Sequence, residues 1–257
     1  MTNQPKNIVI TGASSGIGYF TAKELVNRGH TVFAIARREE KLDKLLKEVI
    51  KYKGRLIIIP FDLSTFNKSI LDSHFNDVDK IDILINNAGL LLNKNFLEIK
   101  EEEIIEVLNV NYISVIKTIQ YFHSLLKESK KPHILNISSV GGVTGSVKFP
   151  GLSIYSSSKG ALSILSECLA EDFKEDNIRV NCLALGSVDT EMLKQAFPDY
   201  KSDTSPELMS SYIVSFALEG MNVINGVTQT VSVSNPWLFK NKIVLIHYKK
   251  NSCKYLV

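Results

Sequence analysis

A tyrosine and a lysine four residues apart, Tyr155 and Lys159, are the side chains of this sequence best suited to move a proton. On a helix, residues four apart share one face, with Cβ atoms about 5–6 Å from each other. A phenol has a pKa near 10, so it exchanges protons poorly at neutral pH unless its anion is stabilised. An ammonium about 4 Å away, at an effective dielectric of about 20, supplies roughly 4 kcal/mol and lowers that pKa by at most about 3. The pair predicts an acid–base tyrosine, and an ordinary helix contact is the alternative.

Hydroxyl and amide side chains that could assist the tyrosine stand earlier in the chain. Ser138 and Ser139 end a β-prone run, where a hydroxyl either caps a turn or donates to a substrate carbonyl oxygen. Asn111 interrupts a helical pattern, so we expect it to face solvent, to bond backbone at a kink or to hold a water. The sequence contains no Ser-His-Asp pattern and no metal spacing of histidines, so it lacks the residues that a hydrolase triad or a metal centre would need.

A glycine-rich turn follows the apolar run Ile8–Ile10 and precedes a helical pattern. Gly12 allows a sharp turn, Gly16 lets backbone approach a phosphate, and Gly18 lets the helix lie close to the strand. The helix N-terminus offers unpaired N–H groups and about half a positive charge, which suits a pyrophosphate. The order of strand, turn and helix therefore predicts a dinucleotide site, with a plain glycine-rich turn as the alternative.

Two arginines, Arg37 and Arg38, follow the predicted strand Thr31–Ala36 at the position that distinguishes the nicotinamide coenzymes. In dinucleotide-binding folds an acidic residue there bonds the ribose 2′-hydroxyl of NAD, whereas an arginine accommodates the extra phosphate of NADP. The sequence predicts that NADP(H) is preferred over NAD(H), with Arg37 contributing more than Arg38; two solvated arginines are the alternative. Asp62, after the third strand, is expected either to hold the adenine amino group or to cap the helix that begins near Ser64.

Strands and helices alternate along the chain. Predicted strands lie at 8–10, 31–36, 55–61, 81–85, 132–137, 178–184 and 227–233, and predicted helices at 18–29, 39–51, 64–76, 101–128, 153–173 and 206–218. This alternation predicts right-handed βαβ crossovers and a parallel sheet with helices on both faces. We expect an α/β protein, a single doubly wound Rossmann-type domain with a mainly seven-stranded parallel sheet, whose ligands lie beyond the carboxyl ends of the strands.

Length and composition suit one such domain, with 257 residues of which 44% are hydrophobic. The sequence has no apolar run long enough for a membrane span and no apparent signal peptide before the first strand, so we expect a cytoplasmic protein. Three scattered cysteines, Cys168, Cys182 and Cys253, predict buried thiols rather than a disulfide scaffold or zinc site. The net charge of +3 includes five lysines near the C-terminus, and the nearly neutral remainder gives no support for nucleic-acid binding.

Together these features resemble the short-chain dehydrogenase/reductase family from about Lys6 to Val233. The resemblance is carried by the glycine-rich turn, by Asn86-Asn87-Ala88-Gly89 after the fourth strand, and by Asn111, Ser139 and Tyr155-x-x-x-Lys159. We therefore expect a Rossmann-type domain over residues 1–234 and an unmatched basic tail over 235–257. The resemblance implies an oxidoreductase that uses NADPH to reduce a ketone or aldehyde reversibly. It also implies a homodimer or homotetramer, associated through helices near 111–128 and 153–173.

Roles for individual residues follow from the same resemblance. Tyr155 would exchange the proton, Ser139 would orient the carbonyl or alcohol, and Asn111 would anchor a water relay. Lys159 would hold the nicotinamide ribose and lower the tyrosine pKa. The residues that the resemblance assigns to the coenzyme are Gly12, Ser14, Ser15, Gly16, Ile17, Gly18, Arg37, Arg38, Asp62, Asn87, Ala88, Gly89, Tyr155, Lys159, Val188 and Thr190.

Three features depart from the family pattern. The stretch from Ser139 to Tyr155 is longer than usual, so its loop could reshape the pocket, and Ser138 stays an alternative to Ser139. Leu185 stands where proline is usual, which predicts a less rigid loop after the sixth strand. A β-prone run at 243–248 in the tail has no counterpart, and it would be an edge strand, a partner contact or a disordered extension.

Two other functions compete with the enzymatic interpretation. A nucleotide-binding regulatory protein would keep the coenzyme site without turnover. The presence of all four expected catalytic residues, Asn111, Ser139, Tyr155 and Lys159, argues against this alternative. A membrane-associated reductase held by its basic tail lacks a convincing apolar helix. The segment Glu191–Ser205, which would cover the substrate, is of mixed polarity and leaves steroid, sugar, acyl-thioester and xenobiotic carbonyls open.

Overall fold

Seven strands form one sheet in the computed structural model, which describes residues 4–233. In sheet order they are β3 (Arg55–Pro60), β2 (Thr31–Ala36), β1 (Asn7–Thr11), β4 (Ile83–Asn86), β5 (His133–Ser139), β6 (Arg179–Leu185) and β7 (Thr228–Val231). Each neighbouring pair is parallel. The strand order reverses between β1 and β4, and open α/β sheets bind ligands at such a point. The predicted α/β fold with a seven-stranded parallel sheet is confirmed.

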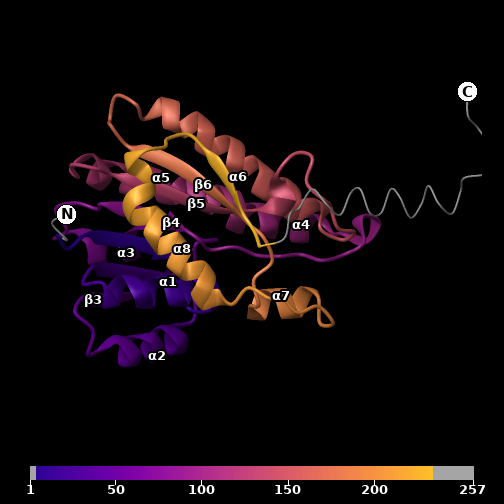
Figure 1. Ribbon diagram of the computed structural model, residues 1–257, viewed down its shortest axis with the longest axis horizontal. Helices are drawn as coiled ribbons and strands as arrows, with labels where there is room; N and C mark the ends of the chain where they lie inside the picture. The colour runs from indigo at the N-terminus through magenta and orange to yellow at the C-terminus, as the bar shows by residue number, and fades with distance from the viewer. Residues whose placement is uncertain (1–3, 234–257) are drawn as a thin grey trace, which may run out of the picture.

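Helices cover both faces of the sheet (Figure 1). Successive strand residues point to opposite faces, so Ile8 and Ile10 pack on one side and Val9 on the other. The first face is covered by α1 (Gly16–Asn27), α2 (Glu39–Val49) and α8 (Pro206–Glu219). The second face is covered by α3 (Lys68–Phe75), α5 (Ser114–Lys127) and α6 (Ser153–Asp172). Burial on both faces explains why the strands read as continuous apolar runs.

Shorter elements connect these layers. They are the 3-10 helices η1 (Phe96–Glu98), η3 (Val140–Gly142) and η4 (Gly220–Asn222), the helices α4 (Glu101–Leu108) and α7 (Glu191–Ala196), and the π-helix η2 (Asn109–Ile113). The π-helix joins α4 to α5 at the predicted interruption. The sequence does not predict α7, because six residues of mixed polarity are too few to show a helical period.

Two predictions about local structure are wrong. Helix α3 begins at Lys68, later than predicted, because Asn67 caps it by accepting a hydrogen bond from Ser69 N at 3.2 Å. Cys168 is exposed rather than buried, since it lies on the outer side of α6. The thiol of Cys182, on β6, is buried as expected.

Some predictions lie outside the described residues. These are Cys253, the β-prone run at 243–248 and the tail over 235–257, so the boundary between domain and tail stays a prediction. Within residues 4–233, no helix has both the length and the hydropathy that a bilayer crossing needs.

A buried histidine joins β5, β6 and α8 inside the fold. The side chain of His133 is fully buried, with Nδ1 3.0 Å from Ala217 O and Nε2 3.2 Å from Asn181 Nδ2. Because Nε2 must accept from the amide of Asn181, Nδ1 carries the proton and donates to Ala217. Burial lowers the pKa of His133 to about 4, since an imidazolium would lose its hydration here. The imidazole is therefore neutral in the folded chain.

We expect His133 to make the fold acid-sensitive. Between pH 6.5 and about 4 the unfolded chain binds a proton at this residue and the folded chain does not, so stability falls as pH drops through that window. The full loss is about 3 kcal/mol. Urea unfolding near pH 7 and near pH 5 should show a smaller pH effect in His133→Gln than in the wild type. His74→Gln, on α3, is the matched control, and an equal pH effect in His133→Gln and the wild type would contradict the assignment.

Candidate functional site

The ends of β1 and β4 are joined by side-chain hydrogen bonds. Thr11 Oγ1 accepts from the N–H groups of Asn87 and Ala88, each at 3.1 Å. Asn87 Nδ2 donates in return to Thr11 O at 3.0 Å and to Gly12 O at 3.3 Å. These bonds fix the predicted Asn-Asn-Ala-Gly segment against the glycine-rich turn, at the edge where the strand order reverses.

The glycine-rich turn leaves the N-terminus of α1 open. Gly12 and Gly16 have φ values of +72° and +54°, which side chains disfavour. A Cβ atom at Gly18 would collide with Gly12 O and with Asn87 Nδ2, so the helix lies as close to the turn as predicted. The N-cap residue Ser15 makes no side-chain hydrogen bond to the helix. The first N–H groups of α1 therefore lack a side-chain cap, and the turn fits an anionic group such as a pyrophosphate.

Arg38, rather than Arg37, contacts this turn. Arg38 Nη2 donates to Ser15 Oγ at 2.8 Å and to Ser14 Oγ at 3.3 Å. Arg37 acts instead on Asp62, whose pKa its charge helps to lower. The sequence ranks Arg37 above Arg38 for binding NADPH, and that ranking stays a prediction.

Asp62 closes a turn of its own. Its Oδ1 accepts from Ser64 N at 2.9 Å and from Ser64 Oγ at 2.7 Å, before α3 begins. These hydrogen bonds lower its pKa against the opposing effect of burial. Asp62 therefore caps a turn rather than the helix, and its contact with adenine stays a prediction.

Asn111 is buried at the π-helix and bonds backbone, one of the three arrangements expected for it. Its Oδ1 accepts from Leu90 N at 2.7 Å, and its Nδ2 donates to Leu90 O and to Ser158 Oγ, both at 2.9 Å. Ser158 Oγ donates in turn to Tyr155 O at 2.7 Å. The segment after β4, the π-helix and α6 are thus held together. The sequence offers no signal for Ser158, because a serine inside a helix is usually solvated.

Ser139 and Ser138 point to opposite sides of the end of β5. Ser139 lies beside Tyr155, and its hydroxyl lowers the pKa of the phenol. Ser138 is buried, and its Oγ donates to Lys159 O at 2.7 Å. Alternation along a strand explains the difference. Of the two serines, Ser139 is the one placed to act together with Tyr155.

Lys159 is buried and bonds the backbone of β5. Its side chain is only 4% exposed, and its Nζ donates to Ile137 O at 2.9 Å. Burial lowers its pKa to about 8. Burial also raises the pKa of Tyr155, the reverse of the predicted direction. The loss of hydration, which the sequence alone does not show, outweighs the favourable effect of the Ser139 hydroxyl.

Gly89 lies beside both Lys159 and Asn111. A Cβ atom at Gly89 would lie 3.3 Å from Lys159 Nζ and 3.5 Å from Asn111 Oδ1. A side chain at this position would therefore crowd the ammonium of Lys159. Contact of that ammonium with the nicotinamide ribose, which the resemblance implies, stays a prediction.

The segment after β6 approaches the glycine-rich turn from the other side. Thr190 caps α7 by accepting from Leu193 N at 3.2 Å, and its methyl group would meet a Cβ atom at Gly16 at 3.2 Å. Val188, two residues earlier, is buried in the core. Leu185 is buried as well, and Gly186 N donates to Val231 O at 2.8 Å. The start of this segment is thus bonded to β7, and the lower rigidity expected from leucine in place of proline stays a prediction.

The long loop before α6 is held by bonds within itself and to the chain after β4. Ser146 Oγ donates to Val143 O at 2.9 Å, which closes the loop on itself. At its far end, Lys94 N donates to Gly151 O at 3.0 Å, and a Cβ atom at Gly151 would collide with Asn93 Oδ1. The loop is therefore packed on the chain that follows β4.

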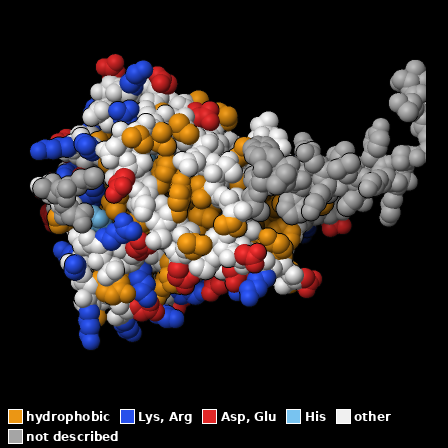
Figure 2. Space-filling model, in the orientation of Figure 1, with side chains coloured by type: hydrophobic (Ala, Val, Ile, Leu, Met, Phe, Trp, Pro, Cys, Tyr) orange, Lys and Arg blue, Asp and Glu red, His pale blue; other side chains and the backbone are white. Residues whose placement is uncertain are grey.

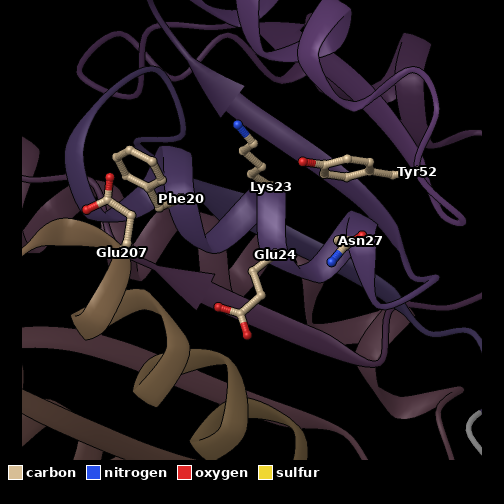
Figure 3. A pocket seen from close by; sticks show the side chains of 6 residues that line it. All are labelled: Phe20, Lys23, Glu24, Asn27, Tyr52 and Glu207. Atoms are coloured by element: carbon tan, nitrogen blue, oxygen red, sulfur yellow. The ribbon is translucent and has the colours of Figure 1, made fainter.

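Two hollows lie outside this group of residues. One of about 620 Å³ adjoins α7 and is lined by Asp189, Lys194, Pro198, Asp199, Tyr200 and Lys201. A smaller one of about 180 Å³ lies on the outer side of α1 and is lined by Phe20, Lys23, Glu24, Asn27, Tyr52 and Glu207 (Figure 3). The smaller hollow contains none of the predicted site residues. Among residues 4–233, no three His, Cys, Asp or Glu side chains are grouped so that they could hold a metal ion.

Known proteins resemble this chain in sequence and in fold. Residues 6–201 match the family described as short chain dehydrogenase. An uncharacterized oxidoreductase of Listeria monocytogenes is 29% identical over 92% of this chain and 100% of its own. The 3-oxoacyl-(acyl-carrier-protein) reductase of Thermotoga maritima is 29% identical over 88% of this chain and 96% of its own. A short chain dehydrogenase of Escherichia coli CFT073, solved in complex with NADPH, has a TM-score of 0.79 at 25% identity and covers 88% of this chain and 95% of that chain.

The buried ammonium of Lys159 should cost stability. Its folded pKa of about 8 lies below the ordinary 10.5, so the unfolded chain binds more protons between these values and stability rises with pH across them. Lys159→Met should lose this rise and should be about 1–2 kcal/mol more stable than the wild type near pH 7, after the lost hydrogen bond is subtracted. Denaturant unfolding from pH 7 to pH 10 measures both effects. Lys51→Met, at an exposed position, is the control, and a Lys159→Met curve parallel to the wild type would refute the prediction.

Proposed function

The chain belongs to the short-chain dehydrogenase family, and from this premise we propose that it interconverts a carbonyl compound and an alcohol with NADPH as coenzyme. One observation carries the proposal. Ser139, the last residue of β5, lies beside Tyr155. Tyr155 is on α6, the helix that also carries Lys159. These residues lie at the sheet edge where the N-terminus of α1 is open. A hydroxyl donor, a phenol and an anion-binding turn at one edge suit a redox reaction of a polar carbon–oxygen bond.

Each polar side chain has a role in the proposed reduction. When bound, reduced nicotinamide supplies a hydride to the carbonyl carbon. The phenol of Tyr155 donates a proton to the carbonyl oxygen, and Ser139 Oγ orients that oxygen. A phenol has an ordinary pKa near 10 and burial raises that of Tyr155, so the proton that the reductive direction requires is present at neutral pH. Asn111, bonded to Leu90 and Ser158, would hold the segment after β4 against α6, and a water relay at this residue stays a prediction.

Several parts of the chain would hold the coenzyme. The N-terminus of α1 suits the pyrophosphate, Lys159 beside Gly89 suits the nicotinamide ribose, and Arg38 suits the 2′-phosphate. The NADPH complex of the E. coli relative supports the choice of coenzyme, as does the absence of a carboxylate directly after β2. The remaining contacts that we propose are Ile17, Arg37, Asp62, Asn87, Ala88, Val188 and Thr190. A cytoplasmic location stays a prediction.

A panel of carbonyl compounds tests the proposal directly. It should contain a 3-oxoacyl thioester, a keto sugar, a steroid ketone and an aromatic aldehyde, each offered with NADPH and with NADH. The thioester comes first because the T. maritima relative is named for that substrate. Consumption of NADPH with at least one of them, faster than of NADH, is the expected result. Tight NADPH binding without turnover on any of them would favour the regulatory alternative.

Removal of the Tyr155 hydroxyl should separate binding from turnover. Tyr155→Phe keeps the ring and loses the proton, so it should bind NADPH as the wild type does while turnover falls by roughly 10²–10⁴. Ser139→Ala should lower turnover through the loss of one hydrogen-bond donor. Ser138→Ala is its matched control, because Ser138 bonds Lys159 O in the core, and it should affect stability more than rate. Normal turnover in Tyr155→Phe would show that the proton comes from elsewhere.

We also propose that the chain forms a homodimer or homotetramer through α5, α6 and the π-helix between α4 and α5. Apolar side chains are exposed there, among them Ile113 in η2 and Ile164 on α6, at 37% and 60%. Exposed apolar side chains of this kind mark association surfaces. Figure 2 shows the other face of the sheet, over α8, where apolar side chains also lie between charged ones but which the proposed interface does not include.

A charge at position 164 should weaken that association. Ile164→Glu places a carboxylate in the proposed interface, so its mass by light scattering should fall below that of the wild type at micromolar concentration. Ile50→Glu, at a 77% exposed position beyond α2, is the control and should not change the mass. A monomeric wild type would refute the assembly, and an oligomer that survives Ile164→Glu would place the interface on another face.

A further inference from the structure

An ion cluster at the rim of the coenzyme site joins two distant parts of the chain. This rim cluster consists of Arg38, Lys41 and Glu191. Lys41 Nζ lies 2.9 Å from both carboxylate oxygens of Glu191, which is 150 residues away in sequence. Arg38 Nη1 lies 3.6 Å from Glu191 Oε2, while Nη2 of the same side chain donates to Ser15 at the glycine-rich turn. The cluster therefore connects the start of α2, the turn and the first residue of α7.

Two cations that share one carboxylate form an anion site. The side chains of Lys41, Arg38 and Glu191 are 33%, 44% and 58% exposed, and ion pairs exposed to this degree contribute little to stability. The carboxylate can therefore leave at low cost. A phosphate monoester carries more charge and more acceptor oxygens than a carboxylate, so it competes well for the same two cations.

We propose that Lys41 binds the 2′-phosphate of NADPH beside Arg38, and that Glu191 occupies this anion site until the phosphate replaces it. The inference rests on the proposed NADPH dependence. In NADH a neutral hydroxyl stands at this place, and it cannot compete with a carboxylate for two cations. Glu191 is then a specificity-determining residue, because its release is linked to the phosphate alone.

The exchange also alters what holds α7. Glu191 is the first residue of this six-residue helix, and α7 leads into the segment that lines the hollow of about 620 Å³. Once Glu191 leaves Lys41, the start of α7 is held at Thr190, which lies against Gly16. Binding of the 2′-phosphate thus loosens the tie between α7 and α2, next to the hollow.

Calorimetry with two fragments tests the exchange without turnover. The probes are 2′,5′-ADP, which carries the 2′-phosphate, and 5′-AMP, which lacks it. Lys41→Gln should weaken binding of 2′,5′-ADP about tenfold, and Glu191→Gln should tighten it about threefold, because one removes a ligand and the other a competitor. Binding of 5′-AMP should change less than about twofold. Lys47→Gln, the same charge change later in α2, is the matched control and should leave both affinities unaltered.

Two binding results would overturn the proposal, and they can be told apart. If both variants bind 2′,5′-ADP as the wild type does, while the wild type still prefers it to 5′-AMP, then NADPH preference stands without Lys41 and Glu191. If the wild type binds both probes equally, the proposed NADPH preference fails and this inference fails with it. Damage to the fold would weaken binding in both variants, so the opposite signs expected for them exclude that explanation.

Hydrogen exchange at residues 191–196 tests the link to α7. In the wild type, exchange should become faster when 2′,5′-ADP is added. In Glu191→Gln it should be fast from the start and should not respond to the probe. Equal exchange in the wild type with and without 2′,5′-ADP would overturn the release of α7.

Discussion

The site depends on one junction, where Thr11 at the end of β1 meets Asn87 at the end of β4. The two residues exchange side-chain hydrogen bonds, and Asn87 also reaches Gly12 O. Because β1 and β4 flank the reversal of strand order, this junction fixes the two halves of the sheet relative to each other. Only glycine fits at Gly18, since a side chain there would collide with both Gly12 and Asn87. The open N-terminus of α1 is thereby placed relative to β5 and α6, which carry the reacting groups.

Polar side chains buried in the core hold those reacting groups. Asn86 Nδ2 donates to Asn136 Oδ1 at 2.8 Å, and Asn136 Nδ2 donates to Ser166 Oγ at 2.9 Å, so β4, β5 and α6 are connected. Asn111 and Ser158 make a second connection nearer the site. Such networks specify one arrangement because a broken member leaves an unpaired polar group in a region of low dielectric. They fix the helix on which Tyr155 stands, and the buried ammonium of Lys159 lowers the stability of the same region.

The sequence predicts features that rest on local signals, and it fails where distant residues or burial decide. The bounds of β2 agree with the prediction because its apolar run ends at charged residues. The face shared by Tyr155 and Lys159 follows from helix geometry, but the raised pKa of Tyr155 does not, because burial shows only in three dimensions. Arg38 and Arg37 are adjacent, and only the orientation of the start of α2 selects the one that meets the turn. The contact between Lys41 and Glu191 spans 150 residues and has no local signature at all.

Transfer of an isotope tests the central claim most directly, namely that the glycine-rich turn and Tyr155 belong to one redox site. The measurement uses NADPH with deuterium at its transferable position and a carbonyl compound that the protein consumes, and it locates the label in the product by mass spectrometry. We predict an alcohol with deuterium at the former carbonyl carbon, formed by the wild type and strongly reduced in Tyr155→Phe. An unlabelled product, or equal labelling by Tyr155→Phe and the wild type, would contradict the account.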